Sequence, residues 1–360
     1  MILRNVNHIL YYLVGSRAIR PTMKIPQLYP RTFASLCSSL FVFIGIVLVA
    51  SCSDDGEKGI DGDTEFKQKM REFVIGISQY AKAINPAFDI IPQNGIELVS
   101  SNADGSGQPH TAYLNAIDAN GQEDLFYGYD NDDQATPNSV RAYLKDLLDI
   151  SKDAGNKILV TDYCSTTSKM ENSYLENSTL EYISFAASQR ELNTIPDFPN
   201  PVNQENNTVV TSVAQVKNFL YLINPDGFPS KTDFINAVTA TNYDLLIMDL
   251  FFSDGSVFTA SEINELKNKA NGGKRLVIAY MSIGEAEDYR YYWQASWNTT
   301  KPSWMDAENP DWPGNFKVKY WNTEWQSIIY GNDGSYLKKI IDAGFDGVYL
   351  DIIDAFEFYE

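Results

Sequence analysis

Carboxylate and amide side chains follow five of the short apolar runs in this sequence. A single acid after a strand commonly caps a helix or forms a turn, but the repetition calls for a different explanation. In a parallel barrel the carboxyl ends of all strands open on one face, so these groups are expected to converge there. The five residues are Asn94, Asp162, Asp249, Glu285 and Asp351.

Histidine-dependent chemistry has little support in this chain. His8 and His110 are the two histidines, and His8 lies in a predicted signal segment. A Ser-His-Asp triad would have to use His110, and a histidine-bearing zinc site lacks ligands. Carboxylate chemistry remains, and glycoside hydrolysis needs one acid to protonate the leaving oxygen and a second as nucleophile or base. An all-oxygen Mg²⁺ or Ca²⁺ site is the alternative; no cofactor is expected.

Aromatic residues are concentrated in one stretch. All six tryptophans lie between Trp293 and Trp325, with several tyrosines among them. Sugar rings have apolar faces that stack on such side chains, so a glycan cleft is one interpretation. The alternative is that these rings pack a long loop against the rest of the fold.

Buried strands are indicated by nine apolar runs with little alternation, a pattern typical of parallel sheets covered on both faces. Nine candidate strands are close to the eight that a barrel needs, so the sequence predicts an α/β fold, and specifically a (β/α)8 barrel. A doubly wound sheet is the alternative, but the Gly-rich turn of its dinucleotide-binding variants is missing. The runs are Phe88 to Pro92, Leu114 to Ala119, Lys157 to Tyr163, Tyr182 to Ala187, Asn218 to Ile223, Tyr243 to Leu250, Arg275 to Met281, Phe316 to Tyr320 and Phe345 to Ile353.

Helices are expected between these runs. The apolar spacing from Phe66 to Ala83 predicts a leading helix that ends at Asn85-Pro86. The segment 192–211 is rich in Pro and Asn without apolar periodicity, which predicts a long connection between two halves of one domain, 64–360. The crossover helices are expected at Ser139 to Ala154, Lys231 to Ala240, Ser261 to Asn271 and Ser335 to Ala343.

The N-terminal segment 1–51 has the layout of a lipoprotein signal peptide. It holds five basic and no acidic residues, and its apolar run ends in Val49-Ala50-Ser51-Cys52. That run is too short to span a bilayer, so we expect cleavage before Cys52, with lipid on this cysteine. Met23 is the expected true start, and 52–63 reads as a flexible tether. The protein is therefore expected to be exported and anchored by lipid to a bacterial membrane, in the periplasm or at the cell surface.

The mature chain is strongly acidic. Of 28 basic residues, 23 remain after residue 51 against 47 acids, a formal charge of −24. Such a surface repels nucleic acid. It would attract a cationic ligand through its long-range field; the alternative is a surface that serves solubility alone. Cys164 is the one cysteine left after the signal segment and Cys52, so no intrachain disulfide is available to the exported fold.

Several long motifs resemble the family 114 glycoside hydrolases, whose relatives include endo-α-1,4-polygalactosaminidases. SIGEAEDYR is the most specific of them, and together they cover most of the chain from residue 64. Their order differs from that of the relatives, which run from FLYLIN through GVYLD to IIPQNG and EDLFYG, so a circular permutation is expected; a truncated or misassembled gene is the alternative. The motifs are VKNFLYLIN, YDLLIMDL, AYMSIGEAEDYRYYW, NPDWPGNFKVKYW, GFDGVYLDIIDAFEFYE, IIPQNGIEL and EDLFYG.

The resemblance implies a (β/α)8 barrel that cleaves an α-linked polysaccharide, with a cationic amino-sugar polymer as the expected substrate. By motif, Asp351 is the implied nucleophile and Glu123 the general acid/base. The other hypothesis is a glycan-binding surface lipoprotein that keeps the barrel without catalysis. The residues expected to line the site are Asp249, Tyr280, Glu285, Arg290, Asn94, Asp162, Tyr163, Tyr320 and Trp321.

Overall fold

The computed structural model describes residues 65–360. The expected signal segment, the lipidation site at Cys52 and the tether lie outside these residues. Among the helices of residues 65–360, none has both the length and the apolar character needed to cross a membrane.

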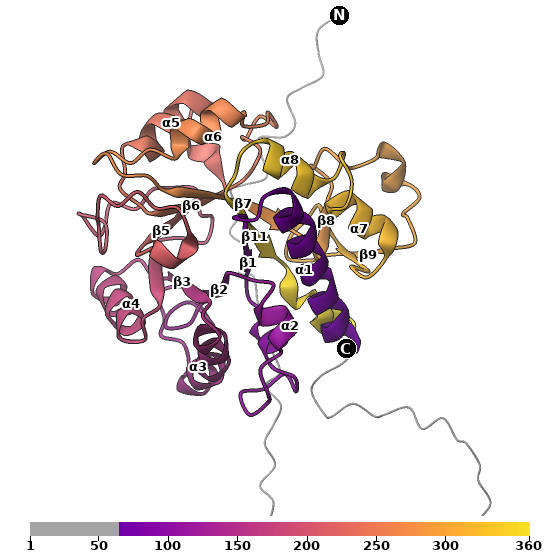
Figure 1. Cartoon of the computed structure of the whole chain (residues 1–360), viewed down its shortest axis with the longest axis horizontal. Helices are drawn as coiled ribbons and strands as arrows, with labels where there is room; N and C mark the ends of the chain where they lie inside the picture. The colour runs from indigo at the N-terminus through magenta and orange to yellow at the C-terminus, as the bar shows by residue number, and fades with distance from the viewer. Residues whose placement is uncertain (1–64) are drawn as a thin grey trace, which may run out of the picture. The chain divides into compact units, whose positions relative to one another are not determined.

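The described chain is an α/β protein with its strands in the middle and its helices around them (Figure 1). The parallel strands are β1 (Asp89–Pro92), β2 (Ala119–Glu123), β3 (Lys157–Tyr163), β4 (Ile183–Ala187), β5 (Phe219–Tyr221), β6 (Leu245–Met248), β7 (Leu276–Ser282) and β11 (Gly347–Asp351). The α-helices are α1 (Glu65–Ile84), α2 (Thr111–Leu114), α3 (Asn138–Asp153), α4 (Thr167–Thr179), α5 (Lys231–Thr239), α6 (Ala260–Leu266), α7 (Thr323–Ile329) and α8 (Tyr336–Asp342).

The parallel strands form two hydrogen-bonded sheets. One has the order β1-β11-β7-β6-β5 and the other the order β2-β3-β4. The two sheets meet at both of their edges. At one edge β1 contacts β2, with a parallel bridge between Gln93 and Gly121, and at the other β4 contacts β5. All eight strands therefore run in one direction, and their carboxyl ends share one face.

The core lies between the strands and the surrounding helices. The central strands β6, β7 and β11 are almost entirely buried, which is why their sequences are continuous apolar runs. Helix α1 buries one face at helical spacing through Met70, Phe73, Val74 and Ile77. The apolar periodicity of the sequence therefore predicted these elements correctly.

A third sheet is small and antiparallel. It has the order β8-β10-β9, with β8 at Glu285–Glu287, β9 at Met305–Glu308 and β10 at Asn315–Val318. The predicted strand from Phe316 to Tyr320 is largely β10, so its assignment to the parallel sheet was wrong. This leaves eight parallel strands from nine candidate runs.

The second parallel strand was also misplaced. Residues 111–114 form helix α2, and β2 begins only at Ala119. Its sequence is ANGQE, in which the buried side chains of Asn120 and Gln122 are polar, so a search for apolar runs does not detect this strand. The hydroxyl of Ser151 donates to Oδ1 of Asn120 over 2.5 Å, which satisfies part of this buried polar group.

Candidate active site

Asp351 and Glu123 lie on the face where the parallel strands end. Asp351 is the last residue of β11, and Glu123 is the last residue of β2. Strand β1 lies between them, because the amide of Gln93 donates to the carbonyl of Leu350 over 2.8 Å and the amide of Asn94 donates to that of Gly121 over 2.9 Å. These backbone hydrogen bonds thus fix Asp351 and Glu123 on either side of β1, at the carboxyl ends of the strands.

The Asp351 carboxylate is held from two sides. The hydroxyl of Tyr280, on β7, donates to Oδ2 over 2.5 Å, and the amide of Ile352 donates to Oδ1 over 2.8 Å. Ile352 has a φ of 60°, which is unusual for a β-branched residue and marks local backbone strain of the kind found at functional sites. Burial, and next the charge of Glu123, raise the pKa of Asp351 to about 7.

Glu123 is positioned by side chains from both neighbouring strands. Tyr163, at the end of β3, donates its hydroxyl to Oε1, and Nδ2 of Asn94 donates to Oε2 over 2.9 Å. Asn94 also accepts a hydrogen bond from the Glu123 amide over 3.1 Å. The guanidinium of Arg190 lies 4.0 Å from the centre of the Tyr163 ring. Asn94 and Tyr163 therefore contact Glu123, and Tyr280 contacts Asp351.

Two tyrosines lie beneath the carboxylates. The Tyr349 hydroxyl is so close to Gly121 that a Cβ at that position would lie 2.0 Å from it, so only glycine fits there. Tyr221 contacts Tyr349, with ring centres 5.2 Å apart, and donates its hydroxyl to Oε1 of Gln93 over 2.8 Å. Burial raises the pKa of both tyrosines, and the charge of Asp351 contributes to both shifts.

A buried ion-pair group stands beside Tyr280. Arg290 contacts Asp249, which follows β6, over 2.7 Å, and contacts Glu287 over 2.5 Å. Burial, and next the charges of Asp351 and Glu287, raise the pKa of Tyr280 well above its usual value. Asp249 and Arg290 are thus near the site, and Arg290 orients carboxylates.

Asp162 does not join the carboxylate pair or the ion pairs of Arg290. It is fully buried, and its carboxylate accepts hydrogen bonds from the amides of Phe126 and Tyr127 and from the side chains of Ser173 and Asn177. Its side chain therefore joins β3 to α4 and to the loop after β2. Burial raises the pKa of this carboxyl.

Glu285 also has other partners. It is fully buried, with Lys317 at 2.6 Å and the side-chain amides of Asn309 and Asn315 at 2.8 Å and 3.2 Å. These contacts hold together the small antiparallel sheet. None of these contacts connects Glu285 with Asp351 or Glu123.

Tyr320 and Trp321 pack at the start of α1. The Tyr320 hydroxyl donates to the carbonyl of Phe66 over 2.8 Å, and Trp321 packs on Phe66 and Tyr359. Of the six tryptophans, Trp297, Trp304 and Trp325 are buried against one another, as the packing alternative predicted, whereas Trp312 is 64% exposed.

Sequence reasoning missed several residues of the site. Glu287 lies within SIGEAEDYR, two residues after Glu285, and its spacing of three from Arg290 was the available signal. Tyr221 and Tyr349 lie in runs recognised as strands, and Gln93 directly follows one, but periodicity alone does not distinguish a buried tyrosine near a site from one in the core.

The arrangement can carry out carboxylate chemistry. Glycosidases use one carboxyl group to protonate the leaving oxygen and a second as nucleophile or base, and Glu123 and Asp351 offer two such groups. Among residues 65–360 there is no cluster of three or more Asp, Glu, His or Cys side chains arranged to hold a metal ion.

Asp351 and Glu123 thus form a pair of carboxylates at the ends of parallel strands in an α/β protein. The sequence model of glycoside-hydrolase family GH114 matches residues 200–359, which confirms the resemblance found in the motifs. Asp351 lies within this match, whereas Glu123 precedes it.

Three relatives are uncharacterized proteins. That of Thermotoga maritima is 42% identical over 122 residues, 34% of this chain and 36% of the relative. That of Deinococcus radiodurans is 43% identical over 123 residues, 34% of this chain and 37% of the relative. That of Methanocaldococcus jannaschii is 44% identical over 128 residues, 35% of this chain and 34% of the relative. The match thus spans about a third of each relative's length.

Proposed function

We propose that this protein is a glycosidase that hydrolyses an α-linked, amino-sugar-containing polysaccharide with two carboxylates. The observation that carries the proposal is the placement of Glu123 and Asp351 at the carboxyl ends of parallel strands, on either side of β1. The GH114 match supports the reaction class. Water is the co-substrate, and the mechanism calls for no cofactor.

In the proposed mechanism Asp351 is the nucleophile. Its carboxylate attacks the anomeric carbon while Glu123 gives its proton to the departing glycosidic oxygen, so the sugar becomes bound to Asp351 as an ester. Glu123 then removes a proton from water, which displaces Asp351 and restores both groups. The hydrogen bonds from Tyr280 and from the Ile352 amide favour the ionised form of Asp351 that this attack requires.

We also propose that the eight parallel strands close into a (β/α)8 barrel. The contacts at both sheet edges, β1 with β2 and β4 with β5, support closure. The permuted motif order is compatible with such a ring, since β1 pairs with β11 as a sequence neighbour would and barrel termini can be moved when they lie at the surface.

The charge of the chain and the proposed lipid anchor bear on the substrate and on where the site lies. A formal charge of −24 after residue 51 favours a cationic polymer. Helix α1 begins beside the active-site face, because Lys67 in its first turn contacts Glu360 over 2.6 Å, and Glu360 follows the strand that carries Asp351. A lipid on Cys52 at a periplasmic or surface membrane would therefore hold the rim of the site near that membrane. A Cys52→Ser variant that stays membrane-bound would contradict the anchor.

The test is hydrolysis of defined polysaccharides by the full chain in detergent, read as new reducing ends. We expect the parent and the surface variant Asp342→Asn to be active, and Asp351→Asn and Glu123→Gln to lose about 10³-fold or more in kcat/KM. A product of retained anomeric configuration is expected from the covalent step. Full activity in Asp351→Asn would refute the proposal.

Glycan binding without catalysis is the second candidate. Two aromatic rings favour it, because Trp312 and Tyr289 are 64% and 63% exposed and offer faces for stacking. It predicts that the parent protein and Asp351→Asn bind a glycan equally well and that neither releases reducing ends.

A further inference from the structure

A pocket lies at the opposite ends of the strands from the carboxylate pair. It has a volume of about 410 Å³ and is lined by the amino ends of β3 and β4 and by the residues just before β5. Lys157 is the first residue of β3 and Tyr163 the last. Six steps along a strand span roughly 20 Å, so this pocket is separate from the candidate active site.

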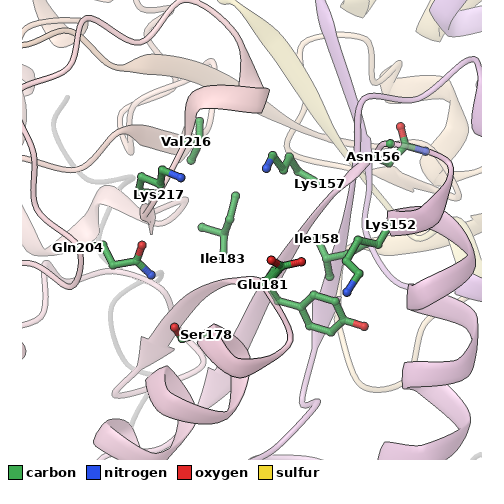
Figure 2. A pocket seen from close by; sticks show the side chains of 12 residues that line it. Lys152, Asn156, Lys157, Ile158, Ser178, Glu181, Ile183, Gln204, Val216 and Lys217 are labelled. Atoms are coloured by element: carbon green, nitrogen blue, oxygen red, sulfur yellow. The ribbon is translucent and has the colours of Figure 1, made fainter.

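Positive charge is concentrated in this pocket, although the chain as a whole is acidic. Lys152, Lys157 and Lys217 line it, and Figure 2 shows the ammonium groups of Lys157 and Lys217 pointing into it. Lys152 already has partners, since it donates to the carbonyl of Leu180 over 3.1 Å and contacts Asp149 at 3.6 Å. Within residues 65–360, the other two ammonium groups have neither a hydrogen bond nor an ion pair.

Hydrogen bonds fix the backbone at these two lysines. The amide of Lys217 donates to Oδ2 of Asp244 over 2.9 Å, and the amide of Lys157 donates to the carbonyl of Asp118 over 3.2 Å. The pocket lies at the seam where β4 contacts β5 without a hydrogen-bonded ladder. Lys157 is partly buried and Lys217 is exposed. Like charges that line one pocket repel each other, and an anion bound between the two ammonium groups reduces that repulsion.

Polar groups line the rest of the pocket. Ser178, Glu181 and Gln204 contribute hydroxyl, carboxylate and amide groups, and Glu181 makes no ion pair with the lysines of the pocket among the residues described. Glu181 has a φ of 61° and Gln204 a φ of 52°, both uncommon for residues other than glycine. These acceptors and donors suit the hydroxyls of a sugar-sized ligand.

We propose that this pocket binds a small hydroxylated anion, a sugar that carries a single carboxylate or phosphate. Lys157 and Lys217 bind the acidic group, and Ser178, Glu181 and Gln204 bind the hydroxyls. A long polyanion does not fit the proposal, because the acidic surface beyond the pocket repels it. The proposal is independent of the hydrolytic function.

The experiment is calorimetric titration of the full chain at low salt with glucuronate, glucose 1-phosphate, inorganic phosphate and glucose. We expect one of the two acidic sugars to bind and glucose not to bind at concentrations up to about 10 mM. Whichever acidic sugar binds more tightly identifies the acidic group. Binding by neither sugar, or inorganic phosphate binding as tightly as glucose 1-phosphate, would overturn the proposal.

Three variants and one control assign the binding to this pocket. Lys157→Gln and Lys217→Gln should each weaken the Kd about tenfold, because each removes a charge-assisted hydrogen bond. Glu181→Gln should tighten it, because the amide can still bind a hydroxyl and no longer repels the anion. Lys145→Gln should change the Kd less than about twofold, because Lys145 lies in α3 outside the pocket and its ammonium group has no hydrogen bond or ion pair with the other residues from 65 to 360. Equal effects of Lys145→Gln and Lys157→Gln would locate the anion elsewhere and refute the assignment.

Discussion

Replacing Asp162 by alanine should destabilise the protein while the carboxylate pair stays in place. In the structure this carboxylate accepts hydrogen bonds from the amides of Phe126 and Tyr127 at 2.7 Å and 3.2 Å. It also accepts them from Ser173 at 2.6 Å and Asn177 at 3.2 Å. The sequence predicted a substrate contact for this residue, so the variant separates the two interpretations.

The loss in the free energy of unfolding depends on which groups keep a hydrogen-bond partner when Asp162 is replaced. Ser173 and Asn177 lie near Ser184, at 3.4 Å and 3.1 Å, and retain a polar partner. The two backbone amides lose theirs, at about 1 to 3 kcal/mol each. Removing a carboxylate whose burial is unfavourable offsets part of this loss, so we expect the free energy of unfolding to fall by about 3 kcal/mol. The melting temperature should then fall by about 6 °C.

The assay combines thermal unfolding with hydrolysis measured well below the melting temperature. Asp162→Ala should unfold at a lower temperature, yet its kcat/KM should remain within about fivefold of the parent. Asp162→Asn should lose only about 1 kcal/mol, since one oxygen still accepts the two amides. If Asp162→Asn unfolds like the parent and loses activity as Asp351→Asn does, Asp162 acts in the site and the structural reasoning is refuted.

Three further predictions concern the charges around the site. Arg290→Met leaves Asp249 and Glu287 buried without their cation, so urea unfolding should show a loss of about 3 to 5 kcal/mol; an unchanged midpoint would contradict this. The pKa of Asp351 is about 7 in the folded protein and near 3.8 when unfolded. Between pH 3.8 and pH 7 the folded state binds more protons than the unfolded state. This carboxyl therefore stabilises the fold below pH 4, and that contribution is lost as the pH rises through 7. A melting temperature higher at pH 8 than at pH 5 would argue against it. Glu123→Gln should lower the Asp351 pKa in an NMR titration, and a value still about 7 would assign the shift to burial alone.

The sequence predicted most of the parallel strands because they are buried on both faces. Strands β6, β7 and β11 appear as apolar runs, and the helices α1 and α3 have one apolar face. Strand β2 and helix α4 were missed for the same physical reason. Their buried positions include polar side chains, such as Asn120 in β2 and Ser173 in α4, whose hydrogen bonds replace apolar contacts.

The acids of the site were only partly predictable. Asp351 follows an apolar strand, and its role came from the GVYLD resemblance, as did that of Glu123. Glu285 and Asp162 fit the same pattern and were chosen for the same reason, yet each has a full set of partners elsewhere. A residue's place at the end of a strand does not determine which side of the strand it faces.

The sequence by itself determined that this is an α/β protein with parallel strands and carboxylates near the strand ends. It did so because burial on both faces requires apolar runs. The tertiary structure decided which carboxylates share a site. Side chains alternate along a strand, so the adjacent residues Asp162 and Tyr163 point to opposite sides of β3. Tyr163 therefore reaches Glu123, while Asp162 binds α4.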